Sequence, residues 1–133
     1  MKNFLVLAGR FLFGGFFVYS GVMHFLHLHD LVEYSGSKGV PMPELAVGAA
    51  GTMLTLGGLS YLLGWHTKWG GVVLLAFLLP AAFLIHSFWK ETDPVTLQIQ
   101  MSYFLRNLAF SGAILMSFRE ARWALGLHSD YVE

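Results

Sequence analysis

Residues 4–23 read FLVLAGRFLFGGFFVYSGVM, a stretch whose one charged side chain is Arg10. A helix of about 20 apolar residues is long enough to cross the hydrocarbon core of a bilayer. Three further apolar stretches follow, at residues 45–64, 69–89 and 97–118. A soluble domain of 133 residues has too small an interior to bury so much apolar surface. We therefore predict one all-α transmembrane domain over residues 1–133, folded as a four-helix bundle in the lipid bilayer.

The composition excludes several classes of function. Hydrophobic residues make up 56% of the chain and charged residues 12%, whereas soluble domains carry about 25% charged residues. The formal net charge is zero, which argues against a nucleic-acid partner, because such proteins present a basic surface to phosphates. The absence of cysteine excludes disulfides, thiolate metal sites and iron–sulfur clusters held by this chain. Any redox chemistry must therefore use a bound cofactor, a metal on nitrogen or oxygen ligands, or a partner protein.

The first stretch is longer than the apolar core of a typical signal peptide, and no Ala-x-Ala-like cleavage site follows it. We read it as an uncleaved transmembrane helix. Arg10, Gly14, Phe17, Gly21 and His24 recur at alternating spacings of four and three, which places them on one stripe. The two glycines on this stripe predict close approach of a neighbouring helix. Arg10 can either snorkel to lipid headgroups or bond to a neighbouring helix.

A second stripe of small residues lies in the stretch 45–64 and predicts close packing there as well. It consists of Gly48, Gly51, Thr55 and Gly58. The link from Trp65 to Lys68 is so short that the helices on either side of it must be antiparallel neighbours. Pro80 lacks a backbone N–H and should kink the third helix.

The connections carry signals for helix ends. Residues 29–37 predict a short interfacial helix between the first two spans, which Gly36 and Gly39 end. Pro43 suits the first turn of the second span. Asp93 followed by Pro94 is typical of an N-cap and the first residue of a helix, so the fourth helix should begin near Pro94.

Basic residues predict the orientation in the membrane. One side of the four-helix arrangement carries Lys2, Arg10, Lys68, Arg119 and Arg122, and the other carries Lys38 and Lys90. The positive-inside rule then places both termini in the cytoplasm.

This orientation brings polar residues from three helices to a similar depth near the outer leaflet. They are His24 and His86, at the outer ends of the first and third helices, and Tyr103, Arg106 and Asn107 in the outer half of the fourth. Each is costly in lipid unless it is paired or functional. We predict that they form one pocket, with Phe17 and Phe88 among its aromatic walls. Within it, His86 and Arg106 are the candidate catalytic groups, and the other residues named here are candidate cofactor-binding groups.

Alternative roles for these residues remain open. Arg106 and His86 can clamp a quinone oxygen or an oxyanion, or Arg106 can snorkel to headgroups or bond backbone carbonyls. A group of histidines lies at the end of the first helix, at positions 24, 27 and 29, next to Asp30. Side chains of these types at such spacings can ligate zinc or copper. His24 and His86 also have the placement for bis-histidine haem ligation. We expect neither a metal nor haem, because solvated side chains at an interface explain the histidines.

Several short motifs, taken in order, resemble the DoxX family of small bacterial membrane proteins along nearly the whole chain. They are Gly9-Arg10, Ser20-Gly21-Val22-Met23-His24, Val40-Pro41-Met42-Pro43, Gly57-Gly58, His86-Ser87-Phe88-Trp89 and Leu105-Arg106-Asn107-Leu108. The resemblance implies a four-helix bundle in the cytoplasmic (inner) membrane and an association with redox systems. One relative is the membrane subunit of a thiosulfate:quinone oxidoreductase. Where relatives often carry a glutamate in the second helix, this chain has Met53-Leu54-Thr55-Leu56, and its tail at residues 125–130 matches only loosely.

Three functions are compatible with these features. The first is a quinone-linked membrane subunit of a redox system, working with another protein subunit or as a homo-oligomer. The second is a structural or assembly subunit in which the polar cluster only fixes helix packing. The third is a small-solute carrier or channel, although no inverted repeat is visible and one four-helix chain leaves little room for a pathway.

The predicted topology has a direct test, because the chain has no native cysteine. A Ser37→Cys variant should react with a membrane-impermeant maleimide from the periplasmic side, since residue 37 falls in the first outer connection. The matched variant Lys68→Cys should react only from the cytoplasmic side. Labelling of the Ser37→Cys variant from the cytoplasm alone would show that the orientation is inverted.

Overall fold

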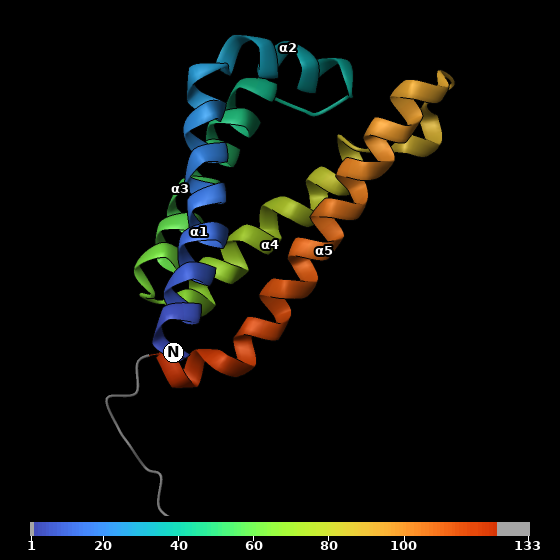
Figure 1. Ribbon diagram of the computed structural model, residues 1–133. Helices are drawn as coiled ribbons and strands as arrows, with labels where there is room; N and C mark the ends of the chain where they lie inside the picture. The colour runs from blue at the N-terminus through green and yellow to red at the C-terminus, as the bar shows by residue number, and fades with distance from the viewer. Residues whose placement is uncertain (1, 125–133) are drawn as a thin grey trace, which may run out of the picture.

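The computed structural model describes residues 2–124, with side chains from residue 3 to residue 119. Its elements are α1 (Lys2–Leu26), α2 (Leu28–Ser37), α3 (Pro43–Leu63), α4 (Thr67–Leu84), the 3-10 helix η1 (Phe88–Lys90) and α5 (Pro94–Ala124). No strand occurs in the described part of the chain, so the all-α prediction and the short helix between the first two spans are confirmed (Figure 1). The tail at residues 125–130, which matches the family only loosely, lies outside the described residues.

Three segments of the described chain are long and apolar enough to cross a membrane. They are Asn3–Leu26 of α1, Pro43–Leu63 of α3, and Thr67–Lys90, which joins α4 to η1. Helix α5 is longer than any of them but less apolar, because Gln98, Gln100 and Arg106 interrupt its hydrophobic sequence. The structure is therefore that of an integral membrane helical bundle, and the fourth span over residues 97–118 stays a prediction.

Helix α1 packs so closely along α3 that the glycines of α1 touch the backbone of α3. A Cβ on Gly14 would lie 2.5 Å from the Leu62 backbone nitrogen, and one on Gly21 would overlap the Thr55 hydroxyl. Phe17, between the two glycines, is 1% exposed. The predicted seam on the first helix is thus confirmed. The predicted stripe on α3 was wrong at Gly48, where an added Cβ would meet nothing within 4 Å.

The turn between α3 and α4 makes these helices neighbours, as predicted. Gly64 ends α3 with φ +69°, and His66 adopts φ 50° just before α4 begins. Above the turn, an added Cβ on Gly57 would lie 2.5 Å from Leu74 Cγ, so no larger residue fits there without movement. The Arg10 guanidinium lies against Gly64 at the C-terminus of α3, where unpaired carbonyls carry partial negative charge. This contact favours the structural interpretation of Arg10.

The predicted starts of two helices are confirmed. Pro43 opens α3, and Pro94 opens α5. Asp93 Oδ2 accepts hydrogen bonds from the Thr96 backbone N–H and the Thr96 hydroxyl, both at 2.8 Å. These bonds, the backbone one foremost, stabilise the carboxylate and hold the pKa of Asp93 below its ordinary value.

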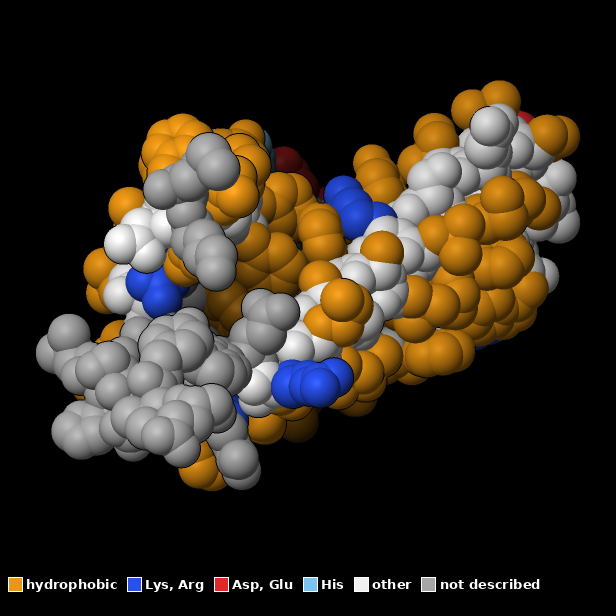
Figure 2. Space-filling view, turned by 60° about the horizontal axis from the view of Figure 1, so that its bottom comes forward, with side chains coloured by type: hydrophobic (Ala, Val, Ile, Leu, Met, Phe, Trp, Pro, Cys, Tyr) orange, Lys and Arg blue, Asp and Glu red, His pale blue; other side chains and the backbone are white. Residues whose placement is uncertain are grey.

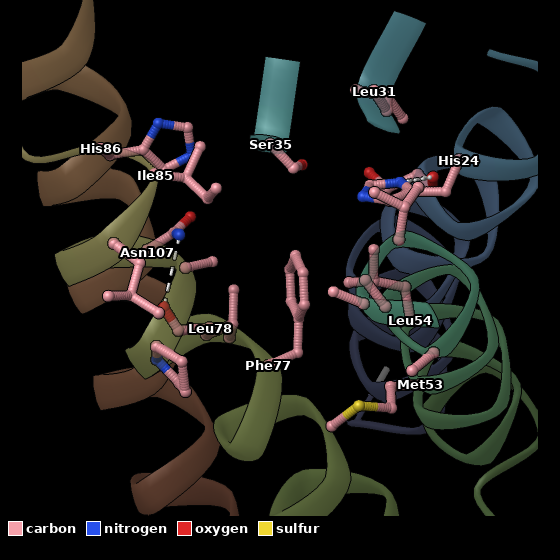
Figure 3. Close-up of a pocket in the computed structure, with 18 of the residues that line it drawn as sticks. His24, Leu31, Ser35, Met53, Leu54, Phe77, Leu78, Ile85, His86 and Asn107 are labelled. Atoms are coloured by element: carbon pink, nitrogen blue, oxygen red, sulfur yellow. Dashed lines mark hydrogen bonds between the residues drawn. The ribbon is translucent and has the colours of Figure 1, made fainter. Parts of the chain in front are cut away.

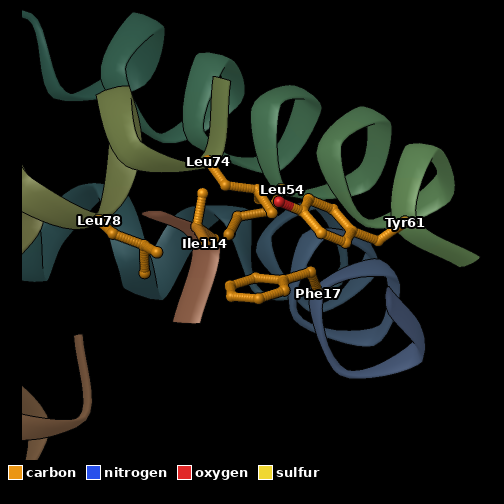
Figure 4. Close-up of a cluster of buried hydrophobic side chains, with 6 residues drawn as sticks. All are labelled: Phe17, Leu54, Tyr61, Leu74, Leu78 and Ile114. Carbon is orange, nitrogen blue, oxygen red and sulfur yellow. The ribbon is translucent and has the colours of Figure 1, made fainter. Parts of the chain in front are cut away.

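The buried core lies where four helices meet. Phe17 comes from α1, Leu54 and Tyr61 from α3, Leu74 and Leu78 from α4, and Ile114 from α5 (Figure 4). The Tyr61 hydroxyl is hydrogen-bonded to Ser117 Oγ at 2.6 Å, so the one phenol in this core has a polar partner.

The helices form two packed halves instead of a closed bundle. Helices α1, α2 and α3 pack on one another, as do α4, η1 and α5, and among helix pairs in the described residues only α3 and α4 bring the backbones of the two halves together. The halves diverge above that contact, and α2 lies across the end of the α1–α3 half (Figure 1). In the space-filling view the surface is largely hydrophobic and is hollowed between the halves (Figure 2).

The third span, predicted over residues 69–89, covers Thr67–Lys90 in the structure, but it is not one continuous helix. Helix α4 stops at Leu84, and the His86 backbone N–H bonds back to the Ala81 carbonyl at 3.1 Å. The chain then turns inward, so that Ser87 is 2% exposed before η1 begins. His86 consequently lies beyond the helix, in a connection.

The glycine seam leads to a stability prediction. Gly58→Ala places a Cβ 2.6 Å from the Val18 backbone nitrogen and should lower the free energy of unfolding by about 1–3 kcal/mol, because neither backbone can move aside. The matched control Gly48→Ala has free space and should raise it by about 0.5–1 kcal/mol, since alanine favours a helix over glycine. Thermal unfolding in detergent micelles measures both. Equal effects of the two substitutions would contradict the packing described here.

Candidate functional site

A cavity of about 430 Å³ lies between the two halves of the molecule. Its walls come from all five α-helices and from the connections after α2 and α4. Most wall residues are apolar, and Phe77 stands on α4 between the side that carries His86 and Asn107 and the side that carries His24 (Figure 3). Its volume falls within the range of about 300–1,000 Å³ usual for small-molecule sites.

His24 faces the cavity from the outer end of α1. Its Nδ1 lies 2.7 Å from the Ser20 carbonyl oxygen. A carbonyl only accepts, so Nδ1 carries a proton, and Nε2 has no hydrogen-bond partner among the described residues. The ring also packs edge-on against Phe77, with a centroid distance of 5.9 Å. Because Phe77 lies on α4, this contact joins His24 to the other half of the molecule.

His86 lines the cavity from the opposite half of the molecule and is the first member of a chain of hydrogen bonds. Its Nδ1 lies 2.8 Å from Gln100 Oε1, and Gln100 Nε2 donates to the Tyr34 hydroxyl at 2.7 Å. Gln100 is 7% exposed, so this amide is paired on both sides in an almost dry environment. Because Tyr34 lies on α2, the chain of bonds also connects α2 to α5 across the cavity.

A second link between the halves lies next to this chain. Lys38, just after α2, forms an ion pair with Glu91, just after η1. The hydrogen bond to Glu91 raises the pKa of Lys38 above its ordinary value. The Tyr34–Gln100 hydrogen bond and the Lys38–Glu91 ion pair thus hold α2 over one end of the cavity.

Arg106 stands at the open side of the cavity between α1 and α5. Its guanidinium carbon lies 4.7 Å from the centre of the Tyr103 ring and 5.9 Å from the centre of the Phe16 ring. Cation–π contact of this kind favours a guanidinium where water is scarce. In the described part of the chain Arg106 has no ion pair and no side-chain hydrogen bond, although guanidinium carries five N–H donors.

Asn107 and Phe17 are the buried members of the predicted set. Asn107 is 4% exposed, and its Nδ2 donates to the Leu78 carbonyl at 3.4 Å. Phe17 packs against Phe110 with a centroid distance of 5.3 Å, and so joins α1 to α5 at the inner end of the cavity.

The structure places His24, His86, Arg106, Asn107 and Phe17 around one cavity and leaves two predicted residues outside its lining. Tyr103 lies behind two of the lining residues. Its ring packs edge-on against His86, with a centroid distance of 5.2 Å, and lies under the Arg106 guanidinium. Phe88 belongs to a separate aromatic cluster on the α4–α5 side. That cluster consists of Phe83, Phe88, Trp89 and Phe104. Helix α4 ends early, and η1 carries Phe88 away from the cavity.

Sequence reasoning missed Gln100 and the residues that α2 contributes. Gln100 carried a signal, since an amide inside an apolar stretch is costly without partners. Tyr34 and Ser35 carried none, because a short interfacial helix can lie on either side of the bundle end. Their position depends on the fold of the connection after α2, where Gly39 adopts φ +81°.

The arrangement joins hydrogen-bonding groups to an apolar slot. Arg106 offers donors, the Nε2 atoms of His24 and His86 can accept or donate a proton, and Ser35 and Tyr34 offer hydroxyls. This combination suits a planar, largely apolar molecule that carries oxygen atoms and exchanges protons.

Comparisons with known proteins agree with the membrane fold. The family model described as DoxX matches residues 5–87, a range that includes His24 and His86 but ends before Arg106. The chain is 28% identical to the "Inner membrane protein YphA" of Escherichia coli (strain K12) over 112 residues, covering 84% of this chain and 79% of that protein. No solved structure matches the chain.

We expect no tightly bound metal at the histidines. Among the described residues no group of three or more His, Asp or Glu side chains is placed to hold an ion, His27 and His29 are exposed, and His24 Nδ1 already bonds a carbonyl. Elemental analysis after exhaustive dialysis should find less than one zinc, copper or iron per chain. A stoichiometric metal that disappears in His24→Ala and His27→Ala variants would contradict this expectation.

Proposed function

The chain belongs to the DoxX family, and we propose that it is the membrane subunit of a redox system that binds a quinone in the cavity between its two halves. A bacterial inner membrane is the matching location, since the relative with 28% identity is named an inner membrane protein. The partner would be another protein subunit or a further copy of the chain.

The observation that carries this proposal is an exposed, unpaired guanidinium at the rim of an apolar cavity that is also lined by two imidazoles. A quinone ring needs a flat apolar slot, a hydrogen-bond donor for its carbonyl oxygens and a route for protons. Phe16, Phe17, Phe77 and Phe110 supply aromatic surface around the cavity, and Arg106 supplies the donor.

The roles of the polar residues follow from their contacts. Arg106 would polarise a ligand oxygen, because its donors are not used by acceptors in the described residues. His86 would hold or release a proton at Nε2, since its Nδ1 is bonded to Gln100. His24, oriented by the Ser20 carbonyl, would accept at the opposite side of the cavity.

A bound quinone supplies two-electron, two-proton chemistry, and the electrons require a donor. With no cysteine the chain holds no iron–sulfur cluster of its own. We therefore propose a partner protein as the electron donor or acceptor. The cytoplasmic or periplasmic side on which it docks depends on the topology predicted above.

One observation favours the alternative of a structural or assembly subunit. His24, His86 and Asn107 each have a hydrogen-bond partner inside the molecule. The described part of the chain also has no buried side-chain nitrogen or oxygen without a partner. A polar cluster whose members satisfy one another can serve only to fix the packing of the two halves.

The two functions differ in what two substitutions do. Arg106→Gln should weaken the binding of a decyl-substituted benzoquinone by roughly ten- to hundredfold, corresponding to a lost charged hydrogen bond of about 1.5–3 kcal/mol. His86→Gln should weaken it by about two- to tenfold, corresponding to a lost neutral hydrogen bond of about 0.5–1.5 kcal/mol. Both variants should melt close to the parent temperature. Equilibrium dialysis of the protein in nanodiscs measures the affinity, and His29→Gln, on the exposed side of α2, is the matched histidine control.

Two results would reject the quinone site. One is a parent protein that binds no quinone and carries none through lipid extraction. The other is a pair of variants that lose thermal stability together while any measured binding survives, which would identify the cluster as a packing device.

A further inference from the structure

The cavity extends to the gap between α1 and α5, where the exposed side chains of Phe16 and Arg106 line it. These two helices have no direct backbone contact in the described residues, in contrast to the α1–α3 and α4–α5 pairs. Only side chains span the gap. Phe16 and Phe17 reach Phe110 at centroid distances of 5.1 and 5.3 Å, and Arg106 reaches the Phe16 ring.

The cavity also borders lipid on the α3–α4 side, where Ala49 and Ala76 are exposed, but its two ends are less accessible. At the outer end α2 covers it and is fastened by the Tyr34–Gln100–His86 chain and by the Lys38–Glu91 pair. At the inner end the buried core closes it, with Leu54 and Leu78 at 2% exposure. A ligand dissolved in water would have to displace one of these closures.

The α1–α5 gap also differs from the rest of the lipid-facing surface in its chemistry. It is bordered by an exposed cation, whereas the outer faces of α1 and α3 are apolar, with Phe11 71% and Leu56 60% exposed. A guanidinium at this depth is costly unless an acceptor meets it. In the described residues it meets only the faces of two aromatic rings.

We infer that the ligand of this cavity is an amphiphile dissolved in the bilayer, which passes sideways between α1 and α5 past Arg106 and Phe16. Its oxygen-bearing head lies among His24, His86 and Arg106, and its apolar tail stays in the gap and continues into lipid. This inference rests on the proposed function and restricts it to quinones with a long hydrocarbon tail.

Phe16 and Arg106 are the residues that the ligand must move. Phe16 is 37% exposed and lies between the Arg106 cation and the Phe17 and Phe110 rings. Its displacement opens the gap without breaking the glycine seam on the other face of α1. Shortening this side chain should therefore change the rates of binding and release more than the affinity.

A crosslink across the gap tests the route. The double variant Ser20→Cys/Tyr103→Cys places one thiol on each side of the opening, and a flexible bismaleimide can join them in a chain without other cysteines. In nanodiscs, quenching of tryptophan fluorescence by a decyl-substituted benzoquinone reports association. Joining the thiols should slow association by about tenfold or more relative to the same variant before crosslinking.

The matched control joins the opposite side of the molecule. Ala49→Cys/Ala76→Cys lies where α3 and α4 border the cavity, and both alanines are exposed. Crosslinking this pair should leave the association rate within about twofold of the unlinked value. Phe16→Ala should raise both the association and the dissociation rate, while Phe11→Ala on the lipid face should change neither.

The outcomes separate the two proposals. If the unlinked protein binds no decyl-benzoquinone, the proposed function fails and this inference fails with it. If it binds the quinone but the α1–α5 crosslink leaves the rate unchanged, or the α3–α4 crosslink slows it as much, the route is wrong and the quinone site stands. A phospholipid retained with the purified protein that the quinone cannot displace would also overturn the inference.

Discussion

The close crossing of α3 over α4 is the contact on which the rest of the structure depends. Gly57 faces Leu74 there, and Gly70 faces Ser60, so the two helices approach more closely than larger residues would allow. Because α3 and α4 are the one pair of described helices whose backbones bring the two halves together, their crossing fixes the angle at which the halves diverge. The cavity is the space that this divergence leaves, and α2 is the element long enough to cover its outer end.

Lipid explains why such an open arrangement can be stable. In water, two diverging helix pairs would expose an apolar groove at a large free-energy cost, but acyl chains solvate that groove as well as they solvate the outer faces. Polar groups have the opposite preference, and three pairs of polar side chains join the two halves. Tyr34 with Gln100, Lys38 with Glu91 and Tyr61 with Ser117 each connect segments far apart in the sequence. Arg106 is the exception, since it has aromatic faces but no acceptor in the described residues.

Local signals in the sequence predicted the helices well, because each depends on a few neighbouring residues. Asp93 with Pro94, Pro43 and the glycines of α1 act within one turn or along one stripe, and all were confirmed. The helix order and direction were also enough to bring His24, His86, Arg106 and Asn107 together. Phe88 lies away from the cavity because the end of α4 is set by tertiary contacts, and Tyr103 packs against His86 and Arg106. His86 bonds to Gln100 and Ser87 is buried, so the chain leaves the helix several residues before its apolar sequence ends.

The contribution of α2 could not be read from the sequence, and it changes what the site can do. Without α2 the cavity would open toward headgroups and water, where an unpaired guanidinium and two imidazoles would simply be hydrated. With α2 held by Gln100 on one side and Glu91 on the other, the same groups lie in a space whose open side faces lipid. Low polarity strengthens each hydrogen bond that a ligand oxygen makes there and raises the cost of leaving Arg106 without one. Helix α2 and the lateral opening thus act together. Helix α2 keeps water out of the cavity, and the opening lets a ligand that carries the missing acceptor enter from the bilayer.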